Sequence, residues 1–121
     1  MGVAMKFSVV TALRDGFSEF RETFHTILGQ TWREFEWILV DDGSRVPLAQ
    51  AFPELASDPR VRILREDTSR GQTAGLNRAI REAKGDWIVR MDGDDLCLPD
   101  RLERIALHRG KRECAAPFFR L

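Results

Sequence analysis

Four compact apolar runs alternate with amphipathic segments along the chain, and this alternation constrains the fold more than any other feature. Short runs rich in β-branched residues are typical of buried strands. Apolar side chains at spacings of three and four form one stripe of a helix. The predicted strands are residues 6–13, 35–44, 60–66 and 86–92, and the predicted helices are residues 17–29, 48–55, 73–85 and 98–108.

This order of elements predicts the fold class. Strands that alternate with helices at such spacing form parallel sheets with right-handed crossovers. We therefore expect an α/β, Rossmann-like open sheet, mainly parallel, with helices on both faces. The 121 residues fit one domain, and no repeat or linker divides them. Residues 109–121 show no clear period, and Pro117 argues against a central strand there.

Composition limits the classes of partner and the compartment. Lysine and arginine together number 19, as do aspartate and glutamate together, so the formal net charge is zero. The charge balance therefore gives no indication of nucleic acid as a partner. No apolar run approaches the roughly 18 residues that a membrane span needs. The two cysteines, Cys97 and Cys114, fit neither a zinc pattern nor a redox pair, which favours reduced thiols. We expect a cytoplasmic protein and leave peripheral membrane association open.

Polar residues gather where three of the predicted strands end. Ala12 to Asp15 follow the first strand, Asp41-Asp42 end the second, and Asp92 to Asp95 follow the fourth. In open α/β sheets, ligands bind at the carboxyl ends of the strands. Asp, Gly and Ser are also common turn residues, so Asp41-Asp42-Gly43-Ser44 alone is equally well explained as a turn. Three carboxylates in four positions, Asp92, Asp94 and Asp95, are more than a turn needs.

A bound cation would offset the repulsion among these carboxylates. Mg²⁺, Mn²⁺ and Ca²⁺ prefer oxygen ligands. A calcium hand is excluded because Leu96 and Cys97 occupy the positions of its third ligand and its glycine. The chain contains neither a P-loop nor a G-x-G-x-x-G fingerprint. These facts favour a divalent cation shared with substrate phosphates.

Several stretches together resemble the family 2 glycosyltransferases of the GT-A fold. They are "FSVVTALRD", "TILGQTWREFEWILVDDGS", "DPRVRILREDTSRGQTAGLNRAIREAKGDWIVRMDGDD" and "LPDRL", and they cover about residues 7–108. The resemblance implies the nucleotide-sugar-binding half of an inverting glycosyltransferase, with a UDP-sugar as donor and a glycan, lipid or protein as acceptor. It also implies Mn²⁺ or Mg²⁺ as the cofactor.

The resemblance assigns roles to individual positions. It implies that Asp42 accepts a hydrogen bond from the base, that Asp94 holds the metal against the diphosphate, and that Asp92 lies near the ribose and the metal. The nine positions implied to contact the nucleotide-sugar are Ala12, Leu13, Arg14, Asp42, Gly71, Asn77, Asp92, Gly93 and Asp94.

Two departures from the family pattern bear on function. The first loop has Ala12, Arg14 and Asp15 where the family often has proline and tyrosine-asparagine. The chain also stops at about half of the family's catalytic domain, before the acidic residue that serves as general base. We therefore expect these residues alone not to transfer sugar. The alternative is a truncated, non-catalytic nucleotide- or metal-binding module. A response-regulator phosphoacceptor is disfavoured, because its acidic pair would have to follow the first strand.

Overall fold

The computed structural model describes residues 6–108 and the backbone of residues 118–120. Its strands are β1 (Phe7–Leu13), β2 (Phe35–Asp42), β3 (Val61–Glu66), β4 (Trp87–Arg90) and β5 (Phe118–Arg120). Its helices are α1 (Phe20–Leu28), α2 (Leu48–Ala51), α3 (Pro53–Ala56), α4 (Gln72–Glu82) and α5 (Arg101–His108). Cys114 and most of the tail lie outside the described residues.

The five strands form one sheet in the order β3-β2-β1-β4-β5. The first four strands are parallel to their neighbours, and β5 pairs with β4 in the antiparallel direction. The predicted α/β fold with a mainly parallel sheet is confirmed. β5 begins directly after Pro117 and lies at an edge, where a proline is tolerated.

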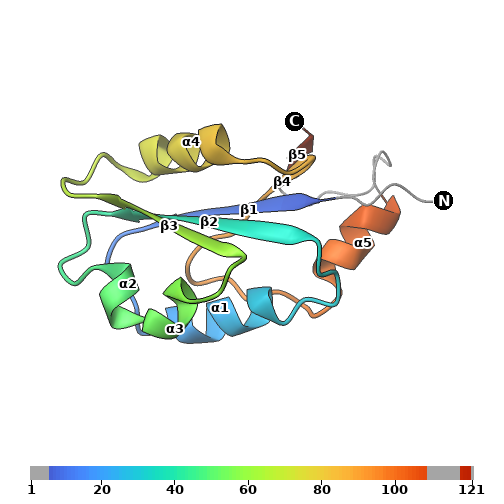
Figure 1. Cartoon of the computed structure of the whole chain (residues 1–121), viewed down its shortest axis with the longest axis horizontal. Coiled ribbons are helices and arrows are strands. Elements are labelled where there is room, and N and C mark those ends of the chain that lie inside the picture. Colours follow the sequence, from blue (N-terminus) through green and yellow to red (C-terminus); the bar gives the residue numbers. More distant parts are fainter. Residues whose placement is uncertain (1–5, 109–117, 121) are drawn as a thin grey trace.

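Helices cover both faces of the sheet (Figure 1). Among the described residues, α4 is the single helix on one face of the sheet. The other face of the sheet is covered by α1, α2, α3 and α5. The larger core lies on the second face, where Trp37 is fully buried and donates its indole N–H to Thr11 Oγ1 at 3.0 Å. A buried indole needs such a partner. Four further large side chains fill this core around it: Phe7, Phe20, Phe24 and Leu55.

Close packing of α4 fixes the end of β1 that leads into the first loop. A Cβ atom added at Gly75 would lie 2.8 Å from the Cβ of Ala12. Real Cβ atoms do not approach so closely, so glycine is what lets the helix lie against the sheet here. Ala12 therefore packs against α4 on the face of the sheet and pairs with Val40 of β2 within it, immediately before the loop.

Several predicted boundaries were wrong in detail, including the strand predicted over residues 35–44, which ends at Asp42, and the helix predicted over residues 73–85, which ends at Glu82. The helix predicted over residues 48–55 is two short helices, because Pro53 disfavours the helical conformation at Phe52, which has φ −132° and ψ 73°. The helix predicted from residue 17 begins at Phe20, and the helix predicted from residue 98 begins at Arg101. The strand predicted over 86–92 ends at Arg90. No helix in the described part of the chain is long and apolar enough to cross a membrane.

Candidate functional site

The carboxyl ends of β1 and β4 meet at the point where the strand order reverses. From β1 the chain proceeds to β2 and β3 on one side, and it then crosses to β4 on the other side. In open α/β sheets this switch point is where ligands bind. An open cleft of about 430 Å³ lies there. The residues that line it are Ala12, Leu13, Asp15, Gly16, Gln72, Arg90, Asp92, Gly93 and Asp94.

The acidic cluster lies at one wall of this cleft. Asp92, Asp94 and Asp95 each offer a carboxylate oxygen, and these oxygens all lie within 4.8 Å of one another. The turn is held by two hydrogen bonds, from the Asp92 N–H to Asp95 Oδ2 at 3.1 Å and from the Asp95 N–H to the Asp92 carbonyl at 3.2 Å. Asp94 is exposed and makes no hydrogen bond or ion pair with any residue that the structure describes.

The donor set of the cluster fits a hard divalent cation. Oxygens bound to one Mg²⁺ at about 2.1 Å lie no more than about 4.2 Å apart. The 4.8 Å limit observed here is close to that value, and two of the three side chains, Asp94 and Asp95, are exposed. Among the described residues, Arg90 is the cation that pairs with the cluster, and its Nε lies 3.4 Å from Asp92 Oδ1. Asp94 and Asp95 therefore retain carboxylate oxygens for a metal.

Asp41, in contrast, is a structural residue. Its carboxylate is fully buried and accepts hydrogen bonds from the backbone N–H groups of Ser44, at 3.1 Å, and Leu48, at 2.7 Å. Arg65 donates to it as well, at 2.9 Å. Burial alone would raise the pKa of Asp41, but the hydrogen bonds from Ser44, Leu48 and Arg65 outweigh burial and lower it. The first acid of the pair thus holds the turn after β2 and the start of α2.

Asp42 holds the loop between β3 and α4. Its Oδ1 accepts the Arg70 N–H at 2.7 Å. Its Oδ2 accepts the Ser69 hydroxyl at 2.7 Å and the Gly71 N–H at 3.0 Å. Burial opposes ionisation, yet these three bonds, with the nearby charge of Arg14, lower the pKa of Asp42. Gly71 has φ +97°, a conformation that suits glycine.

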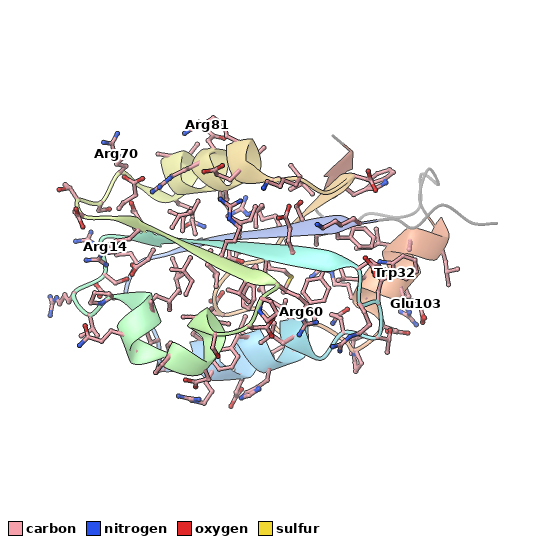
Figure 2. The ribbon with its side chains drawn as sticks, in the orientation of Figure 1. Arg14, Trp32, Arg60, Arg70, Arg81 and Glu103 are labelled. Carbon is pink, nitrogen blue, oxygen red and sulfur yellow. The ribbon has the colours of Figure 1, made fainter. Side chains whose placement is uncertain are left out.

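The structure brings together five of the nine residues predicted from the sequence. Ala12, Leu13, Asp92, Gly93 and Asp94 line the cleft. Arg14, Asp42 and Gly71 lie at the same end of the sheet but are not among the lining residues; Arg14 and Arg70 extend there in Figure 2. Asn77 is exposed on α4 and is likewise not among them. Whether these nine residues bind a nucleotide stays a prediction.

Four lining residues are absent from that prediction: Asp15, Gly16, Gln72 and Arg90. Gly16 is signalled by the Asp-Gly pair after β1, a common turn dipeptide. Arg90 follows an apolar run, but nothing local in the sequence places its side chain beside Asp92. Gln72 is brought to the cleft only by the packing of α4 on β1.

Comparison with known proteins identifies the family. The family model described as "Glycosyl transferase family 2" matches residues 8–117. The chain belongs to glycosyl transferase family 2. One relative, the putative glycosyltransferase EpsE of Bacillus subtilis, is 34% identical over 107 residues. That match covers 86% of this chain and 38% of EpsE. The putative teichuronic acid biosynthesis glycosyltransferase TuaG of the same organism is 28% identical, over 92% of this chain and 44% of TuaG.

Solved structures share the fold of this family 2 chain. S. aureus TarS 1–349 in complex with UDP-GlcNAc superposes with a TM-score of 0.79 at 24% identity, over 86% of this chain and 31% of TarS. The mannosyltransferase PcManGT of Pyrobaculum calidifontis, in complex with GDP-Man and Mn²⁺, gives 0.76 at 24% identity, over 86% of this chain and 32% of its own. This chain therefore spans less than half the length of these family members.

Proposed function

We propose that this chain is the nucleotide-sugar-binding part of an inverting glycosyltransferase. In this proposal a UDP-sugar lies in the cleft, and its diphosphate binds Mn²⁺ or Mg²⁺ held by Asp92 and Asp94. The observation that carries the proposal is a cluster of three carboxylates, two of which line a cleft at the switch point of a family 2 fold. The complexes of TarS with UDP-GlcNAc and of PcManGT with GDP-Man and Mn²⁺ support it by analogy.

The chemistry of sugar transfer explains why a cation belongs beside these carboxylates. Breaking the sugar–phosphate bond places new negative charge on the diphosphate. A divalent metal acts there as a Lewis acid and stabilises the departing charge. Asp92 and Asp94 would hold the metal, and the guanidinium of Arg90, which also lines the cleft and pairs with Asp92, would offer a positive charge to the diphosphate.

Asp42 retains capacity for the role predicted for it. An ionised carboxylate has about four acceptor positions, and the contacts with residues 69–71 use three of them. One position remains for an N–H of a nucleotide base. Asp42 would then join the base to the loop that leads into α4. Arg14, Gly71 and Asn77 are proposed to lie beside the same nucleotide.

Three of the described carboxylates outside the cleft, Glu82, Asp86 and Asp100, are poorly suited to activate an acceptor. Glu82 pairs with Arg62, and Asp100 pairs with Arg104. Asp86 precedes β4, at the opposite end of the sheet from the cleft. General-base catalysis contributes about 10²- to 10⁴-fold, so without it we expect residues 1–121 to bind the donor but not to transfer its sugar. A binding module without transferase activity is therefore the second candidate function.

The acceptor (glycan, lipid or protein), a cytoplasmic location and peripheral membrane association stay proposals.

The proposal is tested by metal-dependent nucleotide binding. Calorimetry with UDP should show binding in Mn²⁺ or Mg²⁺ that weakens at least tenfold when EDTA is added. The variant Asp94→Ala should lose this metal dependence, because it removes the carboxylate that has no other partner in the described structure. Glu103→Gln, on the exposed face of α5, is the matched control. Equal UDP affinity with and without metal, in folded wild-type protein, would refute the proposal.

A further inference from the structure

The loop between β1 and α1 has an unusual backbone conformation at the wall of the cleft. Asp15 has φ +53° and Gly16 has φ +67°, so two successive residues are left-handed. Asp15 is the single non-glycine residue with positive φ in the described part of the chain. Aspartate tolerates this conformation better than most residues, but it is still strained unless neighbouring groups hold it. Both residues line the cleft, so their conformation sets its shape.

Two reciprocal hydrogen bonds hold Asp15 in this conformation. Its backbone N–H donates to Ser44 Oγ at 2.8 Å. Its Oδ1 in turn accepts the backbone N–H of Arg45 at 2.9 Å. The loop after β1 is thereby fixed to the turn after β2, which lies 30 residues further along the chain.

The partner turn is itself rigidly held. Ser44 is buried, with 1% of its surface exposed, and its N–H donates to Asp41. Nη1 of Arg65 donates both to Asp41 Oδ2 and to the Ser44 carbonyl, each at 2.9 Å. The Ser44 hydroxyl is therefore presented to Asp15 from a turn whose backbone is hydrogen-bonded on both sides.

We infer that Ser44 is a positioning residue for the donor site. Ser44 is not among the residues that line the cleft, so it acts through Asp15 by holding the left-handed loop against the nucleotide and its diphosphate. Asp41 and Arg65 contribute by holding the backbone of Ser44 through hydrogen bonds. The inference rests on the proposed function. It assigns a role in nucleotide affinity to the Ser44 side chain, which is buried and does not line the cleft.

The variant Ser44→Ala tests the inference. It removes the hydroxyl that accepts the Asp15 N–H, and we expect UDP to bind in Mn²⁺ about threefold to tenfold more weakly, as the loss of one hydrogen bond implies. Amide hydrogen exchange at residues 14–17 should accelerate by a similar factor. Ser57→Ala is the control, because the Ser57 hydroxyl also makes one local hydrogen bond, to the Glu54 carbonyl, at the far end of α3. Both variants are compared well below their melting temperatures.

Substitutions of Asp15 separate positioning from direct contact. Asp15→Asn keeps an oxygen for the Arg45 N–H and tolerates a left-handed backbone, so it should weaken UDP binding less than Asp15→Ala does. Asp15→Ala loses both properties and should bind at least fivefold more weakly. Equal weakening by both variants would overturn the inference, as would wild-type affinity in folded Ser44→Ala. A wild-type protein that fails to bind UDP would instead refute the proposed function, and the inference with it.

Discussion

Asp42 should stabilise the fold even when no nucleotide is bound, and Asp42→Asn measures how much. Asparagine keeps one oxygen and replaces the other with an amide group that donates hydrogen bonds. The Arg70 N–H faces Oδ1 and the Gly71 N–H faces Oδ2, so in either orientation of the amide one backbone N–H meets another donor. The remaining bonds also lose the strength that the negative charge gave them.

The magnitude follows from these contacts. Arg70 and Gly71 are exposed, so water partly satisfies the N–H that meets a donor, and its loss costs about 0.5–1 kcal/mol. The loss of charge assistance adds about 1 kcal/mol, so we expect Asp42→Asn to lower the free energy of unfolding by about 1.5–2 kcal/mol. With a urea m-value of about 2 kcal/mol/M, the unfolding midpoint falls by about 0.7–1 M. The fluorescence of buried Trp37 reports the transition.

The pH dependence of this effect gives a second measurement. The native pKa of Asp42 is lowered, whereas in the unfolded chain it is about 3.9. The stabilisation is therefore complete above about pH 4 and is lost as the pH falls through the native pKa. The difference between wild type and Asp42→Asn should shrink at pH 3. Asp67→Asn, at a fully exposed side chain, is the control. A variant as stable as this control at pH 7 would refute the argument.

Two further predictions concern packing and the opposite end of the sheet. Gly75→Ala should lower stability by about 1–3 kcal/mol in urea unfolding, because the new methyl group meets Ala12 at 2.8 Å; an unchanged midpoint would show that α4 moves away freely. Glu36→Ala removes the acceptor of the Ser8 hydroxyl and the Lys84 N–H, both at 2.6 Å, and should cost about 2–3 kcal/mol while leaving UDP affinity within twofold. Weakened UDP binding in that variant would show that the two ends of the sheet are coupled.

The order of strands and helices was predictable because each element carries its own apolar pattern. The stripe through Phe20, Phe24 and Ile27 buries one face of α1, as the spacing requires. The run from Phe35 to Val40 is buried throughout, as expected of a central parallel strand. The local pattern did not resolve the boundaries of the elements. An example is the break before Pro53, where one proline outweighs a continuous apolar stripe.

The location of the candidate site was predictable, but which of its residues hold the loops and which remain open to a ligand was not. Acidic residues at strand ends indicated the end of the sheet at which the cleft lies. The contact of Arg65 with Asp41 joins residues 24 positions apart, and that of Asp15 with Ser44 joins residues 29 positions apart. Such bonds depend on how the strands pair, which spacing along the chain does not reveal. The turn explanation considered for Asp41 is the one that its contacts support.

The two acidic clusters differ in the property that decides which of them holds a cation. Both carboxylates at the end of β2, Asp41 and Asp42, are buried and receive hydrogen bonds from backbone N–H groups, so their lone pairs are largely occupied and their charge is already compensated. The carboxylates after β4 receive few donors from the described residues, and two of the three are exposed. Apart from the pairing of Arg90 with Asp92, the described residues do not compensate their mutual repulsion. A cation would relieve it, whereas at Asp41 or Asp42 a cation would first have to displace hydrogen bonds that hold the loops of the cleft in place.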